Sequence, residues 1–202
     1  MRRDRVVALA ILAAAFVVAT AAVFPGIIHS GNARPVPQAD PRHPRLKYGD
    51  SLVSINDRCA VKEGPLSAAI RPIYVNGKPV GFCCTTCPPV FMQGPEPYLE
   101  RMQAAFRDPV DPKRPARIAA GLRYSVNWEI FYFATRASMD AFRKDPLAYC
   151  GWLTDPVTGV RFRPTARSPK FLQAGRWYFF TSDSTRTEFM RAPFDYSIRK
   201  GA

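Results

Sequence analysis

The first feature of the hydrophobic pattern is an uncharged, mostly apolar run over residues 6–24, which has no polar face. As a helix it would span about 28 Å at ~1.5 Å per residue, close to the thickness of a bilayer core. Three arginines precede the run within the first five residues, and positive flanks of this kind stay in the cytoplasm. We therefore expect residues 1–24 to be a transmembrane anchor, with a signal peptide cleaved near the Ala-Thr-Ala sequence at 19–21 as the alternative.

The pattern changes at residues 25–47, which are polar and rich in proline and predict an extended spacer. The chain has two histidines, His29 and His43, and both lie in this spacer. The remainder has no imidazole, which excludes Ser-His and Cys-His catalysis there. Its acidic residues form no acid/base pair at a readable spacing, and we expect these to be exposed: Glu96, Glu100, Glu129, Asp140 and Glu188. We expect a binding protein and not an enzyme, with no catalytic residues.

After the spacer, one pattern of aromatic residues and proline occurs three times. The landmarks are Phe82, Phe91, Pro95 and Tyr98, then Phe133, Phe142, Pro146 and Tyr149, then Phe180, Phe189, Pro193 and Tyr196. Registered landmarks of this kind indicate a repeated supersecondary unit. We expect three units at residues 48–106, 107–151 and 152–202.

Each unit has the local signals of a hairpin followed by a short helix. Asn76-Gly77 and Gly175 predict hairpin turns, while Thr135 and Ser182 predict helix N-caps. In the middle unit the spacing of Ala137, Ala141 and Phe142 predicts the inward helix face, and Asp145-Pro146 predicts the helix end. The aromatic residues of the strands are expected to form the core. The predicted fold class is α+β, with tandem small ββα units following an N-terminal hydrophobic helix.

Four of the five cysteines lie in the first unit. Cys59 precedes the hairpin, and Cys83, Cys84 and Cys87 follow it where a helix is expected to begin. A hairpin end and a helix start are rigid enough to hold thiolates around a metal ion. Thiolate ligands suit Zn(II) or Cu(I) and disfavour Mg(II) and Ca(II). Cys150, at the end of the middle unit, is expected to be a buried small residue or an extra thiol.

The first unit resembles the YHS/TRASH metal-binding domain. The resemblance rests on Cys59-Ala60-Val61, Asn76-Gly77-Lys78, Gly81-Phe82-Cys83-Cys84-Thr85-Thr86-Cys87, Phe91 and Glu96-Pro97-Tyr98. It implies a treble-clef-like unit in which Cys59, Cys83 and Cys87 are the metal thiolates and Cys84 is a fourth or spare ligand.

The other two units resemble the same family without its thiols. In the last unit Asp155 takes the place of Cys59, while Thr181 and Thr185 occupy the later ligand positions. Ala134 and Ser138 occupy those later positions in the middle unit. We therefore expect both units to keep the fold and to lack the metal site.

The formal net charge is +13, but the basic residues are spread along the chain and form no dense block. Together with the expected export, this spread argues against nucleic acid as a partner. We expect a soft-metal binder in the inner membrane, facing the periplasm, that acts as a carrier, sensor or accessory subunit with a protein partner in the cell envelope. It would be periplasmic if the signal is cleaved. The alternatives are a thiol-disulfide redox protein using Cys84 and Cys87, or a structural module with disulfide-bonded cysteines.

Overall fold

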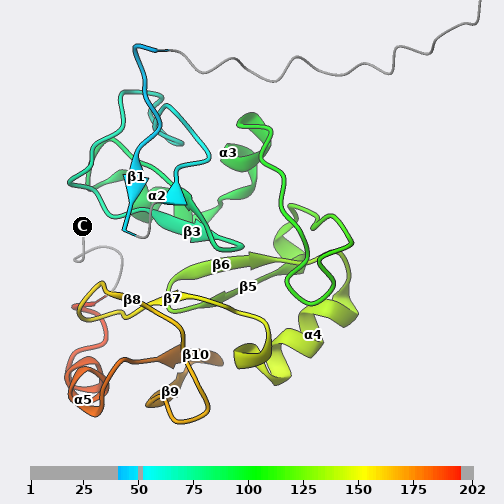
Figure 1. The fold of residues 1–202 in the computed structure, drawn as a ribbon, viewed down its shortest axis with the longest axis vertical. Coiled ribbons are helices and arrows are strands. Elements are labelled where there is room, and N and C mark those ends of the chain that lie inside the picture. Colours follow the sequence, from blue (N-terminus) through cyan, green and yellow to red (C-terminus); the bar gives the residue numbers. More distant parts are fainter. Residues whose placement is uncertain (1–40, 50–51, 197–202) are drawn as a thin grey trace, which may run out of the picture. The chain divides into compact units, whose positions relative to one another are not determined.

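The computed structural model describes residues 41–49 and 52–196. The expected anchor at 1–24 and most of the expected spacer at 25–47 lie outside these residues. Within the part that the structure describes, no helix has the length and apolar character needed to cross a bilayer. The described residues form an α+β fold with small sheets and short helices (Figure 1).

Most elements belong to three antiparallel hairpins that are each followed by a helix. The first motif comprises β3 (Ile73–Val75), β4 (Lys78–Val80) and α2 (Cys87–Gln93), with α3 (Glu96–Arg101) after it. The middle motif comprises β5 (Arg123–Val126), β6 (Glu129–Tyr132) and α4 (Arg136–Lys144). The last motif comprises β9 (Lys170–Gln173), β10 (Arg176–Phe179) and α5 (Asp183–Arg191). Two further antiparallel pairs are β1 (Lys47–Tyr48) with β2 (Leu52–Val53), and β7 (Leu153–Thr154) with β8 (Arg161–Phe162).

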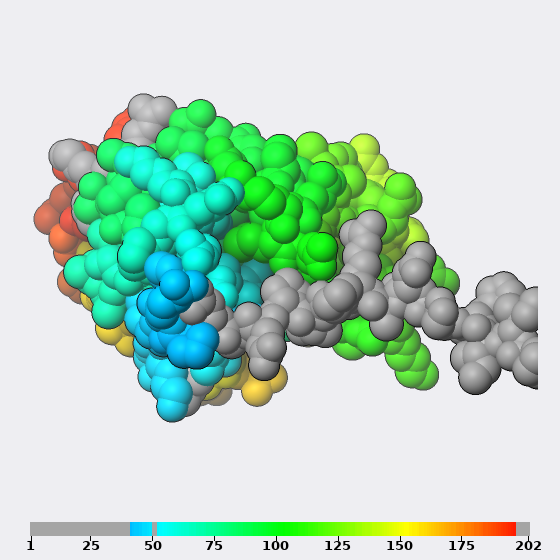
Figure 2. Space-filling view, turned by 90° about the horizontal axis from the view of Figure 1, so that it is seen from above, coloured from blue at the N-terminus to red at the C-terminus, as the bar shows by residue number. Residues whose placement is uncertain are grey.

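The first two hairpins share one sheet of strand order β4-β3-β6-β5. They join through a parallel pairing of Val75 with Ile130. The last hairpin is a separate two-stranded sheet in which β10 lies beside β5, and the Tyr124 hydroxyl donates a hydrogen bond to the Gly175 carbonyl at 3.0 Å. Figure 2 shows the start of the described chain, in blue and cyan, packed against the green segments that follow it.

The predicted turns and helix caps are confirmed. Every hairpin turns on two residues of positive φ, namely Asn76 and Gly77, Asn127 and Trp128, and Ala174 and Gly175. Two successive residues of this kind make the turn that matches the twist of a hairpin. Thr135 caps α4 by accepting a hydrogen bond from the Ser138 amide, and Ser182 caps α5 in the same way from Thr185.

The repeated aromatic landmarks of the sequence contact one another in each motif. The six phenylalanines are fully buried, and their ring centroids are 5.4 Å apart for Phe82 and Phe91, 5.2 Å for Phe133 and Phe142, and 5.3 Å for Phe180 and Phe189. The landmark tyrosine follows at 5.8 Å from Phe91 for Tyr98, 6.3 Å from Phe142 for Tyr149, and 6.2 Å from Phe189 for Tyr196. Each helix is therefore held on its hairpin by the same aromatic contact.

The predicted inward face of α4 is wrong at one position. Phe142 is buried, but Ala137 is exposed and Met139 takes the inward place. Ala137 lies five residues before Phe142, which is about 140° around a helix of ~3.6 residues per turn, whereas Met139 lies about 60° away. The large side chains therefore set the buried face.

A repeated hydrogen-bond pattern, which we call the asparagine bridge, connects each motif to the chain segment before it. In each bridge one asparagine side chain accepts from the N–H and donates to the C=O of the same residue. The pairs are Asn56 with Gly81, Asn76 with Tyr132, and Asn127 with Phe179, and the bonds are 2.7–2.9 Å long. The same amide group also donates to a second carbonyl that is nearer in sequence, that of Arg58, Arg107 or Thr154 respectively.

The bridged residues are equivalent in the three motifs, because each directly precedes the landmark phenylalanine of its motif. Gly81 differs in size from Tyr132 and Phe179 because the Tyr48 hydroxyl and Leu66 would lie 2.9 Å from a Cβ atom there. Asn76 and Asn127 are themselves hairpin-turn residues. The turn of one motif therefore holds a strand of the next.

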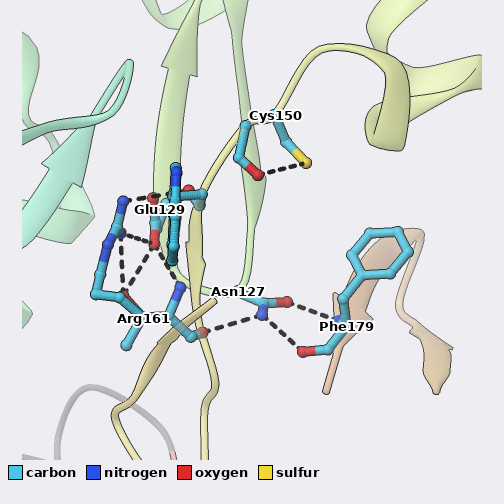
Figure 3. Close-up of polar contacts among 8 residues, drawn as sticks. Asn127, Glu129, Cys150, Arg161 and Phe179 are labelled. Carbon is cyan, nitrogen blue, oxygen red and sulfur yellow. Dashed lines mark hydrogen bonds and ion pairs between the residues drawn. The ribbon is translucent and has the colours of Figure 1, made fainter. Parts of the chain in front are cut away.

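Glu129, in β6, lies where the middle motif contacts the β7–β8 pair, and its burial corrects the sequence expectation that it is exposed. Its side chain is 3% exposed, and its Oε1 accepts from the Arg161 guanidinium at 2.6 Å and from the Thr154 amide at 2.7 Å (Figure 3). The Arg161 guanidinium also lies 3.6 Å from the Tyr74 ring centroid. Burial raises the pKa of Glu129 to about 7, although Arg161 and Thr154 act in the opposite direction.

We expect Asn127→Ala to lower the free energy of unfolding by about 3 kcal/mol, because it leaves the buried N–H and C=O of Phe179 without partners. Urea denaturation of both proteins measures the difference. The matched control is Ala174→Asn, at the exposed equivalent turn position of the last motif, which should change stability by less than about 0.5 kcal/mol. Equal effects at the two positions would contradict the bridge.

Glu129 predicts a pH dependence of stability. Its pKa in the folded protein is about 7 against an ordinary value of 4.5, so the folded state binds more protons between these values. The associated stability is therefore present below pH 4.5 and is lost as the pH rises through 7. Glu129→Gln keeps the acceptor for Arg161 and should flatten the pH profile between 4.5 and 7, measured by thermal unfolding. A variant with an unchanged profile would show that another group titrates.

Candidate metal centre

Three of the four cysteines predicted as ligands converge on one point. The Sγ atoms of Cys59, Cys83 and Cys87 all lie within 4.8 Å of one another. Cys59 and Cys87 are buried at 1% and 0% exposure, and Cys83 is partly exposed. A metal bound at about 2.3 Å from each sulfur needs thiolates about 4 Å apart, so only a small contraction is required. The donor set therefore fits a soft metal ion.

The opening turn, residues 59–64, directs Cys59 toward the other two thiols. The turn closes through hydrogen bonds from the Cys59 amide to the Gly64 carbonyl and from the Glu63 amide to the Cys59 carbonyl. Arg101, at the end of α3, holds the turn by donating to the Ala60 carbonyl at 2.6 Å and pairing with Glu63 at 3.1 Å. The Lys62 amide points at the Cys59 sulfur at 3.5 Å. The turn is thus positioned by both its own backbone and a neighbouring helix.

The remaining thiols come from the loop after β4 and from the first residue of α2. The Cys83 and Cys87 sulfurs are 3.8 Å apart. The first asparagine bridge fixes the distance between the two halves of the centre, since Gly81 is two residues before Cys83 and Arg58 directly precedes Cys59. Asn56 was not recognised as important from the sequence, because nothing near it marks its partner 25 residues away.

Cys84 lies beside the three converging thiols and not among them. Its sulfur is 3.2 Å from the Cys87 sulfur and 3.2 Å from the Thr86 hydroxyl. It is partly exposed, and Thr85 and Thr86 next to it are exposed. The structure therefore brings together Cys59, Cys83 and Cys87 and leaves Cys84 outside that group, in contact with Cys87.

The environments of the thiols shift their pKa values in opposite directions. Burial raises the pKa of Cys83 to about 11 and raises that of Cys87 as well. Burial alone would raise the pKa of Cys59, but hydrogen bonds led by that from the Lys62 amide lower it. The Thr86 hydroxyl lowers the pKa of Cys84 to about 6, and the negative charge of Cys84 in turn raises the pKa of Lys62. Cys59 and Cys84 are therefore the thiols that ionise first.

The last motif has a buried carboxylate where the first has thiols. Asp155 is fully buried, and its Oδ1 accepts from the Val157 and Thr158 amides. Its Oδ2 accepts from the Thr181 amide and hydroxyl at 2.8 Å and from the Thr185 hydroxyl at 3.1 Å. Asp155, Thr181 and Thr185 stand at the places of Cys59, Cys83 and Cys87, so hydrogen bonds connect the three positions without a metal ion.

The middle motif also has a buried carboxylate at this place, and the sequence did not lead us to expect it. Asp108 is fully buried, and its Oδ1 accepts from the Val110 and Asp111 amides. Its Oδ2 accepts from the Ala134 amide at 2.7 Å. The signal was the sequence Asp-Pro-Val, which occurs at 108–110 and again at 155–157.

The fifth cysteine lies away from the centre. Cys150 is 5% exposed, and burial raises its pKa to about 12. Its sulfur lies 3.9 Å from the Gly151 carbonyl oxygen (Figure 3). All five cysteines are free thiols in the structure. A comparison with models of protein families, with curated proteins and with solved structures found no match for this chain.

We expect Asp155→Asn to destabilise the protein by about 2 kcal/mol, because an amide group replaces one of the acceptor oxygens. Burial by itself would raise the pKa of Asp155, but hydrogen bonds led by that from the Thr181 amide lower it below the ordinary 3.8. The stabilisation is therefore present above pH 3.8 and is lost as the pH falls through the lower folded value. The difference between wild type and variant should shrink on acidification, as measured by thermal unfolding.

The control for this variant is Asp183→Asn in the first turn of α5. The Asp183 side chain is 75% exposed. Among the ion pairs of the described residues, it pairs only with Arg186, which lies one helical turn away. Its substitution should change stability by less than about 0.5 kcal/mol. An effect as large as that of Asp155→Asn would mean that lost charge, and not the buried hydrogen bonds, explains both.

Proposed function

We propose that this protein binds one soft metal ion through the thiolates of Cys59, Cys83 and Cys87, as a metal carrier, sensor or accessory subunit of the cell envelope. The observation that carries the proposal is the convergence of three sulfurs within 4.8 Å from segments more than 20 residues apart. Thiols are weak hydrogen-bonding groups, so three of them gain little from meeting in a core unless they share an ion. The envelope location rests on the expected anchor at 1–24.

The donor set narrows the choice of metal. The converging ligands are all sulfur, and soft thiolates select Cu(I) or Zn(II) over harder cations. Cu(I) needs no further ligand in such a site. Zn(II) would need a fourth ligand, which water or Cys84 could supply after a small movement.

We interpret the three motifs as repeats of one treble-clef-like ββα unit. Each has the same turn, aromatic contact and asparagine bridge, while only the first has the thiols. Asp108 and Asp155 join the corresponding positions of the other two through hydrogen bonds. Under this proposal those motifs form a scaffold, or a surface for a protein partner, and only the first takes the metal.

A second candidate function is thiol-disulfide exchange, and the 3.2 Å between the Cys84 and Cys87 sulfurs supports it. In that reaction the Cys84 thiolate would attack a substrate disulfide and release one substrate thiolate. Cys87, as a thiolate, would then attack Cys84 in the mixed disulfide and release the second substrate thiolate. The substrate gains two electrons, and the protein retains a Cys84–Cys87 disulfide.

The proposal predicts one tightly bound soft metal ion per chain. We expect the full chain, purified in detergent under reducing conditions, to take up Cu(I) or Zn(II) to one equivalent, measured by atomic absorption after desalting. Single replacement of Cys59, Cys83 or Cys87 by serine should weaken binding by about 100-fold or more, since a ligand is lost. Cys150→Ser, which changes a buried thiol outside the centre, should bind as the wild type does.

A wild-type chain that takes up neither ion would overturn metal binding. Turnover of a disulfide substrate that Cys84→Ser abolishes, in a chain that binds no metal, would establish the redox alternative instead. Mapping of free thiols by mass spectrometry without reductant separates metal binding from a structural role, because disulfide-bonded cysteines would be protected from alkylation.

A further inference from the structure

We propose that Cys84 is the exchange ligand of the metal centre: it binds the ion only during transfer and passes it between the buried thiolates and a thiolate-bearing acceptor. The inference rests on the proposed function and adds a role that the three-thiol centre does not itself require. Its basis is the position of the Cys84 sulfur, which lies 3.2 Å from a buried ligand and on the side of the centre that is partly exposed.

The burial of two of the three resident thiols favours such a residue for fast exchange, because Cys83 alone among them is partly exposed. Cys59 and Cys87 have exposures of 1% and 0%, so an incoming sulfur cannot approach them without displacing protein atoms. Metal transfer between thiolates proceeds by stepwise replacement, in which a new metal–sulfur bond forms before an old one breaks. The acceptor must therefore reach the ion from the partly exposed side of the centre, where Cys83 and Cys84 lie.

The Cys84 sulfur is partly exposed and lies next to the buried ligand Cys87. Thr85 and Thr86, which follow Cys84, are exposed, so an acceptor can approach along this loop. The Thr86 hydroxyl at 3.2 Å holds the Cys84 sulfur outside the three-thiol group. The cost of moving it inward is one exposed hydrogen bond, which is small for a bond that solvent can replace.

The surrounding charge favours an anionic acceptor. The exposed Lys62 ammonium interacts with the Cys84, Cys87 and Cys83 sulfurs at the mouth of the centre. An acceptor that presents thiolates is attracted by this positive charge. The formal net charge of the described residues is also positive. A protein or peptide with a pair of cysteines is the chemical class that fits.

The transfer balances without any change of oxidation state. The Cys84 thiol loses its proton to water, and its sulfur forms a bond to the ion while the bond to Cys87 breaks. An acceptor thiolate then bonds to the ion as the bonds to Cys83 and Cys59 break in turn. A second acceptor thiolate displaces Cys84, and the released protein thiolates take up protons from water according to their pKa values.

The test compares metal retention with transfer rate in Cys84→Ser. The full chain in detergent is loaded with one equivalent of Cu(I), mixed with excess dithiothreitol, and the copper retained by the protein is followed over time. We expect transfer to be about tenfold slower in the variant, or about 1.4 kcal/mol in activation free energy. Equilibrium affinity, measured by competition with bicinchoninate, should stay within about threefold, because no resident ligand is lost.

Two further variants keep the result interpretable. Cys84→Ala removes the serine oxygen and should be as slow as Cys84→Ser, while Cys150→Ser should transfer at the wild-type rate. Equal rates in Cys84→Ser and wild type would overturn the exchange role. A large loss of affinity in Cys84→Ser would also overturn it, since Cys84 would then be a resident ligand and metal binding itself would stand. Failure of the wild type to bind Cu(I) would instead overturn the proposed function.

Discussion

An asparagine side chain offers one acceptor oxygen and two donor hydrogens. Three asparagines in this fold use these groups to bind backbone N–H and C=O groups that are far apart in sequence. Each bridge fixes the end of the second strand of a hairpin relative to a residue just before a turn. In the first motif these two points are Gly81 and Arg58. Those two points carry the ligand positions, because Cys83 follows Gly81 by two residues and Cys59 follows Arg58 directly. The spacing of the thiols is therefore set by an amide that is not part of the centre.

The three motifs show two chemical ways to join the same positions. In the first motif three thiols meet, whereas in the other two a buried carboxylate accepts hydrogen bonds from the facing backbone amide. A carboxylate stays in place permanently, while a metal ion can leave. The neighbours of the first motif therefore need no ion to join these positions.

The sequence predicted the features that depend on local signals. The Asn76-Gly77 turn, the caps Thr135 and Ser182 and the repeated phenylalanines follow from residues close together in the chain, and the structure confirms them. It did not predict the asparagine bridges, because Asn127 and Phe179 are 52 residues apart and neither has an unusual neighbour. Burial of Glu129 was missed for the same reason, since its partner Arg161 is 32 residues away, in β8. The cysteine spacing indicated the centre, but the offset of Cys84 depends on side-chain directions that spacing does not encode.

The hairpin turns also give the series of motifs a direction. Asn76 holds the middle motif and Asn127 holds the last, while Ala174 occupies the equivalent turn position of the last hairpin. A methyl group can neither donate nor accept a hydrogen bond, so this turn offers a following hairpin no anchoring point. Asparagine at position 174 would supply that anchoring point, so a hairpin added after the last one would be held as the middle and last hairpins are held.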